Sequence, residues 1–242
     1  MDAIVISNLT KKYKDITAVD NLSLTIPSGG IFALLGVNGA GKTTTIRMLS
    51  CLTLPTSGDA TLLGKSILTE PQEVKSLIAV SPQETAVAPN LSVAENLELL
   101  AGVHSFSREK TKEKTDELIK LFGLSGIAKR RAKTLSGGWQ RRLSIAMALI
   151  SEPKILFLDE PTLGLDVIAR RELWDIIGSL RGKVTVILTT HYMEEAEMLS
   201  DRIAIMKDGR LLVVGSADEI KQAAGVERFE DAFIHFAKGE RA

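Results

Sequence analysis

Two glycine-rich stretches of this 242-residue sequence have the composition of anion-binding turns. The first, GVNGAGKTT, covers Gly36 to Thr44, and the second, TLSGGWQRR, covers Thr134 to Arg142. In each, small residues open a predicted helix, so that backbone N–H groups and the positive end of the helix dipole face a bound anion. One bound anion needs only one such turn, so the second requires an explanation.

The first stretch fits the phosphate-loop pattern G-x-x-x-x-G-K-[ST] through Gly36, Gly41, Lys42 and Thr43. Lys42 is expected to reach the β- and γ-phosphates of a nucleotide, and the Thr43 hydroxyl to bind Mg²⁺. The other loop residues expected to contact nucleotide are Asn38, Gly39, Ala40 and Thr44. A glycine-rich turn with an exposed lysine is the alternative, and it is disfavoured because the stretch lies between an apolar strand at residues 31–35 and a helix.

The stretch ILFLDEPT places two acids, Asp159 and Glu160, at the C-terminal end of a buried strand. Ligands of open α/β sheets bind at that edge. We expect this strand to be a parallel neighbour of the phosphate-loop strand, which brings both acids to the γ-phosphate. Asp159 then holds Mg²⁺, and Glu160 orients and deprotonates the attacking water. A helix N-cap is the alternative role for such acids, and the phosphate loop favours the catalytic one.

The totals limit the function classes. Lysine plus arginine equals aspartate plus glutamate, at 30 each, so the chain lacks the basic excess usual in nucleic-acid binders. The one cysteine, Cys51, excludes an intrachain disulfide, favours a reducing compartment and is expected to be a small buried residue. No apolar run is long enough to span a bilayer, so a membrane role requires another chain.

The hydrophobic pattern predicts an α/β protein. Near-continuous apolar strands at residues 155–158 and 184–190, with a helix between them, predict a mostly parallel sheet covered on both faces. Alternating residues at 21–26 predict an N-terminal antiparallel β layer, and Asp-Gly within residues 203–215 predicts a hairpin. Ser92 and Glu95 form a capping box at the start of a helical region.

We therefore expect a single domain with the fold of a P-loop NTPase. Its ATP-binding core, with the antiparallel layer, covers about residues 1–83 and 152–225. An inserted helical subdomain covers about residues 84–151, and residues 226–242 form a C-terminal helix.

Six motifs together resemble the ATP-binding subunit of ABC transporters. GVNGAGKT, SPQET, LSGGW, ILFLDEP, LGLD and TTHYMEEAE occur in that family's order between about residues 3 and 222. The resemblance implies an ATPase with ATP and Mg²⁺ as ligands, and the surrounding sequence is most similar to exporters of drugs, sodium or polysaccharides.

The resemblance also implies roles for single residues. Tyr13 would stack on adenine, with Val19 packed beside the ring. Gln83 would meet Mg²⁺ and the lytic water, His191 would contact the γ-phosphate, and Asp166 would lie in the loop that crosses a dimer interface. Without the resemblance, Tyr13 would be interpreted as a surface aromatic residue and His191 as a structural histidine.

The resemblance accounts for the second anion-binding turn. Ser136, Gly137 and Gly138 of one protomer would cap the γ-phosphate bound to the phosphate loop of a second ATPase subunit, with a homodimer favoured. ATP would close this dimer and ADP would open it. A separate transmembrane permease subunit would dock around residues 84–100 and hold the chain, itself cytoplasmic, on the inner face of the cell membrane.

Two residues depart from the family pattern. Trp139 stands where the family usually has glutamine, and Leu163 stands where serine is common. An importer ATPase subunit is the near alternative in function. A soluble non-transport ABC ATPase acting on nucleic acid or ribosomes is a further alternative, but no nucleic-acid partner is expected at zero net charge. A small-molecule kinase is disfavoured by LSGG.

Overall fold

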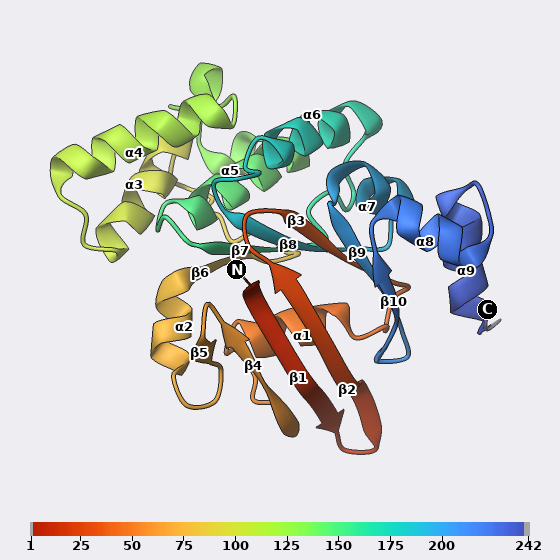
Figure 1. Ribbon diagram of the computed structural model, residues 1–242. Coiled ribbons are helices and arrows are strands. Elements are labelled where there is room, and N and C mark those ends of the chain that lie inside the picture. The colour runs from red at the N-terminus through yellow and green to blue at the C-terminus, as the bar shows by residue number, and fades with distance from the viewer. Residues whose placement is uncertain (1, 240–242) are drawn as a thin grey trace.

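The computed structural model describes residues 2–239 as two β-sheets with helices packed on them (Figure 1). The antiparallel sheet has the order β2-β1-β4-β5, from β1 (Asp2–Tyr13), β2 (Ile16–Pro27), β4 (Ser57–Leu62) and β5 (Lys65–Ser66). The second sheet has the order β10-β9-β3-β8-β7-β6, from β3 (Ile31–Leu35), β6 (Ile78–Ser81), β7 (Ile155–Asp159), β8 (Thr185–Thr190), β9 (Arg202–Lys207) and β10 (Arg210–Gly215). It is parallel except for β10, so the predicted fold class is confirmed.

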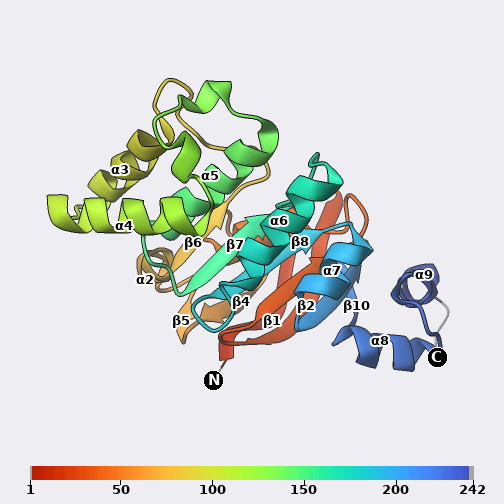
Figure 2. The ribbon, with the colours of Figure 1, turned by 90° about the horizontal axis from the view of Figure 1, so that it is seen from above.

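The helices fall into groups along the chain. Those of the core are α1 (Lys42–Leu49), α2 (Pro71–Leu77), α6 (Val167–Gly178), α7 (Met193–Leu199), α8 (Ala217–Ala224) and α9 (Phe229–Lys238). Between β6 and β7 the chain forms α3 (Val93–Val103), α4 (Arg108–Leu121), α5 (Gly137–Leu149) and two short 3-10 turns, Ser125–Ile127 and Ala132–Thr134. In Figures 1 and 2, α3 and α4 lie at the end of the molecule opposite α8 and α9.

The six-stranded sheet is buried on both faces, as its apolar strands predict. Along β3, Ile31, Ala33 and Leu35 enter the apolar cluster that includes residues of α3 to α7. Phe32 and Leu34 point to the opposite face, into the cluster formed with the antiparallel sheet and α1. Successive side chains of a strand alternate between faces, so one short apolar strand contributes to both cores.

Local signals determine the start of α3 and the last hairpin. The Ser92 hydroxyl accepts from the Glu95 amide at 3.2 Å, and the Glu95 carboxylate accepts from the Ser92 amide at 2.7 Å. The bond from the Ser92 amide to the carboxylate lowers the pKa of Glu95. Asp208 and Gly209 join β9 to β10 with φ of 49° and 77°, both in the left-handed region that tight hairpins use.

Three sequence expectations need correction. The strand that carries Asp159 is not a neighbour of β3, because β8 lies between β3 and β7. Cys51 is only partly buried, although burial still raises the pKa of its thiol. The C-terminal helix is α9, which ends at Lys238, and residues 240–242 of the predicted helix lie outside the described residues.

Candidate active site

The phosphate loop follows β3 and leads into α1, and its glycines are required by close contacts. A Cβ on Gly36 would lie 2.4 Å from the main-chain oxygen of Met206. A Cβ on Gly41, where φ is 97°, would lie 2.5 Å from the main-chain oxygen of Ala18. Real Cβ atoms are not found so close to backbone, so both positions admit only glycine.

Lys42, the first residue of α1, is buried with its ammonium group turned into the loop. Its Nζ donates to the main-chain oxygens of Gly36 at 2.7 Å and Val37 at 3.3 Å. It also forms an ion pair with Glu160 Oε1 at 3.4 Å. The lysine therefore binds the loop's own oxygens and a carboxylate, in the place where an anionic ligand would meet it.

Asp159, at the end of β7, is connected to the phosphate loop across the intervening strand. Its Oδ1 accepts from the Thr43 hydroxyl at 3.0 Å and from the Thr189 hydroxyl at 2.5 Å. The Thr189 hydroxyl in turn accepts from the Glu160 amide at 3.0 Å. Thr189 of β8 thus fixes both acids, and its role could not be predicted from the sequence because a threonine inside a β-strand carries no distinctive signal.

Glu160 lies between a cation and a histidine, and it is only 6% exposed. Its Oε2 is 2.8 Å from His191 Nδ1, on the opposite carboxylate oxygen from Lys42. Its backbone φ of 48° is left-handed, a conformation that costs a residue with a side chain about 1–3 kcal/mol. Such cost is typical of functional positions, where surrounding contacts hold the side chain in place.

A cavity of about 590 Å³ opens beside these residues, within the usual range of about 300–1,000 Å³ for small-molecule sites. It is lined by Tyr13, Ile16, Thr17, Ala18, Asn38, Gly39, Ala40, Gly41, Lys42, Thr43, Thr44, Gln83, Glu160, Leu163, His191 and Asp208. Tyr13 is 44% exposed, and Lys11 Nζ lies 4.9 Å from the centre of its ring. The cavity therefore combines a phosphate loop and a carboxylate with an accessible aromatic ring.

Some predicted site residues lie outside this lining. Val19 is fully buried behind Gly41. Asp166 is the N-cap of α6, where its carboxylate accepts from the Ala169 amide at 2.9 Å. Ser136, Gly137 and Gly138 begin α5 and are not among the cavity-lining residues, so in one chain the two glycine-rich turns do not line a common cavity.

The second turn is exposed at the start of α5. Ser136 is the N-cap of α5, yet its side chain makes no capping hydrogen bond. Gln140 Nε2 donates to the main-chain oxygens of Ala132 at 3.1 Å and Leu135 at 3.3 Å, which fixes the segment before the turn. The first amides of α5 are thus not capped by the Ser136 side chain.

The two departures from the family pattern have separate places. The Trp139 ring lies 4.7 Å from the guanidinium carbon of Arg142, which pairs with Glu172 of α6. Trp139 therefore helps to join α5 to α6 within the chain. Leu163 lines the nucleotide-sized cavity instead.

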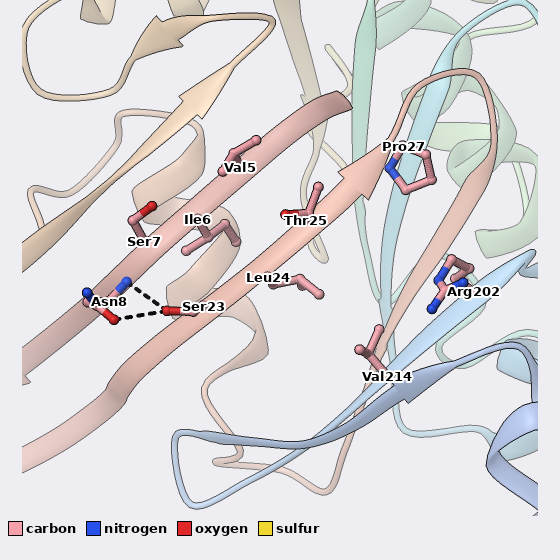
Figure 3. A pocket seen from close by; sticks show the side chains of 10 residues that line it. All are labelled: Val5, Ile6, Ser7, Asn8, Ser23, Leu24, Thr25, Pro27, Arg202 and Val214. Atoms are coloured by element: carbon pink, nitrogen blue, oxygen red, sulfur yellow. Dashed lines mark hydrogen bonds between the residues drawn. The ribbon is translucent and has the colours of Figure 1, made fainter. Parts of the chain in front are cut away.

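A larger hollow, of about 710 Å³, lies between the antiparallel sheet and strands β9 and β10 (Figure 3). Asn8 and Ser23 join β1 to β2 there, by hydrogen bonds of 3.0 and 3.1 Å. Arg202 is the one charged side chain among the ten that line it. This hollow has neither the two acids nor the phosphate loop among its lining residues, so chemistry and not size distinguishes the candidate active site.

The donor set beside the loop fits a hard divalent cation. The Thr43 hydroxyl and the Asp159 carboxylate are in direct contact, and Gln83 lines the same cavity. Oxygen ligands of this kind, with few protein groups and room for phosphates, suit Mg²⁺. Over residues 2–239, no helix is both long and apolar enough to cross a bilayer.

Comparisons with known proteins agree with this geometry. The sequence model of the family described as "ABC transporter" matches residues 19–163. The daunorubicin/doxorubicin resistance ATP-binding protein DrrA of Streptomyces peucetius is 43% identical over 224 residues, which are 92% of this chain and 68% of that protein.

Solved structures extend the likeness to three dimensions. A structure described as the ATP-binding subunit of an ABC transporter has a TM-score of 0.85 and 25% identity, covering 97% of this chain and 99% of that one. A dimeric ATP-binding cassette in a post-hydrolysis state, bound to ADP and Pi, has a TM-score of 0.78 and 29% identity, covering 88% and 98%.

Proposed function

The chain belongs to the ABC transporter family, and we propose how its residues bind and hydrolyse ATP to drive export. The observation that carries the assignment is the position of Glu160, which contacts Lys42 of the phosphate loop and His191 with its two carboxylate oxygens. A buried carboxylate beside both a phosphate-binding cation and a histidine is the arrangement that a general base for hydrolysis requires.

ATP enters with its phosphates over the loop and its adenine against Tyr13, with Val19 supporting the loop from behind. The loop amides of residues 36–44 and the N-terminus of α1 bind the phosphates. Lys42 exchanges its bonds to the loop oxygens and to Glu160 for the β- and γ-phosphates, which carry more charge. The carboxylate of Glu160 is thereby freed to accept a proton.

In the hydrolytic step a water oxygen bonds to the γ-phosphorus while the bond from that phosphorus to the bridging oxygen of ADP breaks. Glu160 takes the proton from the water, and His191 holds its Oε2 and contacts the γ-phosphate. Gln83 positions the water. Mg²⁺, held by Thr43 and Asp159 with Gln83 close by, would neutralise phosphate charge when bound.

The second turn serves a second copy of the chain. Ser136, Gly137 and Gly138 lie outside their own cavity with an uncommitted hydroxyl, which supports a lid on the ATP of the partner. In a two-fold homodimer each lid contact is made twice, and Asp166 begins the helix next to the interface. The post-hydrolysis dimer found among the similar structures supports this pairing.

The transport partner is a separate permease. Leu99 and Val103 are exposed apolar residues of α3, 48% and 69% accessible, and they support docking of a membrane subunit on residues 84–100 and the end of that helix. The chain would then be cytoplasmic and peripheral to the membrane. The name of the similar Streptomyces protein favours export of an organic drug-like molecule over import, and zero net charge argues against a nucleic-acid partner.

The test is the solution mass of Glu160→Gln with and without Mg-ATP. This variant should bind ATP, barely hydrolyse it and form a dimer that is lost without ATP. Ser136→Arg added to it should abolish the dimer while ATP binding persists, because the lid and not the phosphate loop is blocked. Ser125→Arg, on the short turn before the lid segment, is the matched control and should leave the dimer intact. A Glu160→Gln chain that binds ATP and stays monomeric contradicts the homodimer.

A further inference from the structure

Arg141, on the helix that begins with the second turn, is buried although it carries a permanent charge. It is 5% exposed. Its Nη1 donates to the main-chain oxygen of Pro82 at 2.6 Å, and its Nη2 donates to the main-chain oxygen of Gln83. The planar fork of a guanidinium suits two neighbouring acceptors, and here they belong to consecutive residues of one loop.

The location of this side chain costs free energy, so its contacts call for an explanation. Burial lowers the pKa of Arg141, and the nearby charge of Asp159 opposes that effect. Both hydrogen bonds go to peptide carbonyl oxygens, which carry no formal charge. The two hydrogen bonds of this buried guanidinium are best explained by a role in holding the loop in its conformation. An apolar residue would pack in the same place without the cost of desolvating a charge.

A second contact joins the same two elements. The Ser81 hydroxyl, at the end of β6, lies 3.1 Å from the Ser144 hydroxyl of α5, and both side chains are buried. Ser144 is three residues after Arg141, so both project from one side of α5. That helix lies alongside β6 and the segment leaving it (Figure 2).

We propose that Arg141 is a positioning residue that fastens the loop of Gln83 to the helix of Ser136–Gly138, so that the two move as one body. The proposal rests on the function proposed above, in which Gln83 serves the chain's own ATP and the Ser136–Gly138 turn serves the partner's. A change of ligand at either position then displaces the other. The link would make the two ATP sites of a dimer respond to each other through a single rigid contact.

Hydrogen–deuterium exchange of the full-length protein tests the link directly. In Arg141→Met, the backbone amides within residues 82–90, which are those of residues 83–88 and 90 because proline has no N–H, should exchange about tenfold faster or more, the scale expected from losing a hydrogen bond to a charged group. The kcat for ATP hydrolysis should fall by a similar factor while the Kd for ATP stays within about twofold, since the phosphate loop is untouched. Arg141→Lys has one ammonium group in place of the planar guanidinium, so its exchange rates and its kcat should lie between those of wild type and of Arg141→Met.

Arg142→Met is the matched control. Arg142 is the next residue of α5 and is also buried, but it pairs with Glu172 and Trp139 and not with the Gln83 loop. Its loss should lower the melting temperature without speeding exchange in residues 82–90. Equal exchange in that segment for Arg141→Met and Arg142→Met would show a general loss of stability and overturn the proposal. Exchange of this segment at the wild-type rate in Arg141→Lys would also overturn the proposal. This second variant tests the proposal even if Arg141→Met does not fold.

The Gln83→Ala background separates this proposal from the proposed function. If Arg141 acts through Gln83, then Arg141→Met should reduce kcat by less than about twofold once Gln83 has been replaced. An equal reduction in both backgrounds overturns the link. If Gln83→Ala alone leaves kcat unchanged, the catalytic role of Gln83 fails, while the exchange rates still decide whether Arg141 fastens the loop.

Discussion

Glu160→Gln should lower the free energy of unfolding when ATP is absent, and bound ATP should cancel that loss. The same substitution should slow ATP hydrolysis. The substitution keeps the size and shape of the side chain and removes its charge. In the structure that charge lies 3.4 Å from Lys42 Nζ and 2.8 Å from His191 Nδ1, in a buried position. Without nucleotide, Lys42 then keeps its bonds to the main-chain oxygens of Gly36 and Val37 but loses its only buried counter-charge among the described contacts.

The size of the effect follows from these contacts. Breaking a buried ion pair from one side costs about 3–5 kcal/mol. The two main-chain acceptors and the amide that replaces the carboxylate offset part of this, so we expect the free energy of unfolding to fall by about 2 kcal/mol. For a chain of this length, 1 kcal/mol shifts the melting temperature by about 2–4 °C, and the variant should melt about 4–8 °C below wild type.

ATP should cancel this loss. Its phosphates supply the negative charge that Lys42 lacks in the variant, and in the wild type they must displace the Glu160 carboxylate first. The rise in melting temperature on adding ATP should therefore be larger in Glu160→Gln than in wild type. Hydrolysis should fall by about 10²–10⁴-fold, the usual contribution of a general base.

The assay is thermal unfolding with and without Mg-ATP, together with phosphate release. Glu152→Gln is the control, since Glu152 pairs with Lys110 and Lys114 at the surface, where an ion pair contributes about 0–1 kcal/mol. Equal melting temperatures for Glu160→Gln and wild type in both conditions would refute the stability reasoning. A phosphate-release rate within threefold of wild type would refute the assignment of Glu160 as the base.

Two other substitutions test the surroundings of the site. Glu195 is fully buried and accepts from the Thr162 hydroxyl at 2.8 Å and the Trp174 indole at 3.1 Å. Burial raises its pKa above the ordinary value of 4.5, so the folded state binds the proton more tightly and the free energy of unfolding falls as the pH rises from 4.5 to the folded pKa. Urea unfolding between about pH 4 and 8 should show this fall flattened in Glu195→Gln, and an unchanged profile would count against it. Gly41→Ala should weaken ATP binding by tenfold or more in calorimetric titration, as expected for about 1.4 kcal/mol or more of strain. Gly39→Ala, where φ is also positive but no atom lies within 4 Å of the added Cβ, should weaken it much less.

Local chemistry explains which parts of the fold were predictable. Gly41 is needed at its own position by its φ and by one close contact, and the Asp208–Gly209 turn needs only its own two residues. Helices α2 and α7 were missed because each has seven residues, too few for a helical period to be visible. The order of strands depends on contacts between distant segments, and no local pattern indicates that β8 separates β3 from β7.

The residues of the site likewise divide into those with a local sequence signal and those that depend on contacts between distant segments. The pair Asp159 and Glu160 was visible because two acids after four apolar residues are unusual. Arg141 was not, because in WQRR it is indistinguishable from a surface charge, and only the folded chain brings it to the oxygens of Pro82 and Gln83. Residues that act through main-chain atoms of another segment have no partner side chain to reveal them.

The resting arrangement of the chain explains why hydrolysis would depend on both nucleotide and partner. Before ATP binds, Glu160 forms an ion pair with Lys42, so the proposed base would become available only when phosphates replace it as the partner of the lysine. Even then the cavity of one chain lacks the Ser136–Gly138 turn, because α5 presents it outside the lining. In the proposed dimer, hydrolysis would remove the γ-phosphate that the Ser136–Gly138 turn binds, so the two chains would separate after each hydrolytic step.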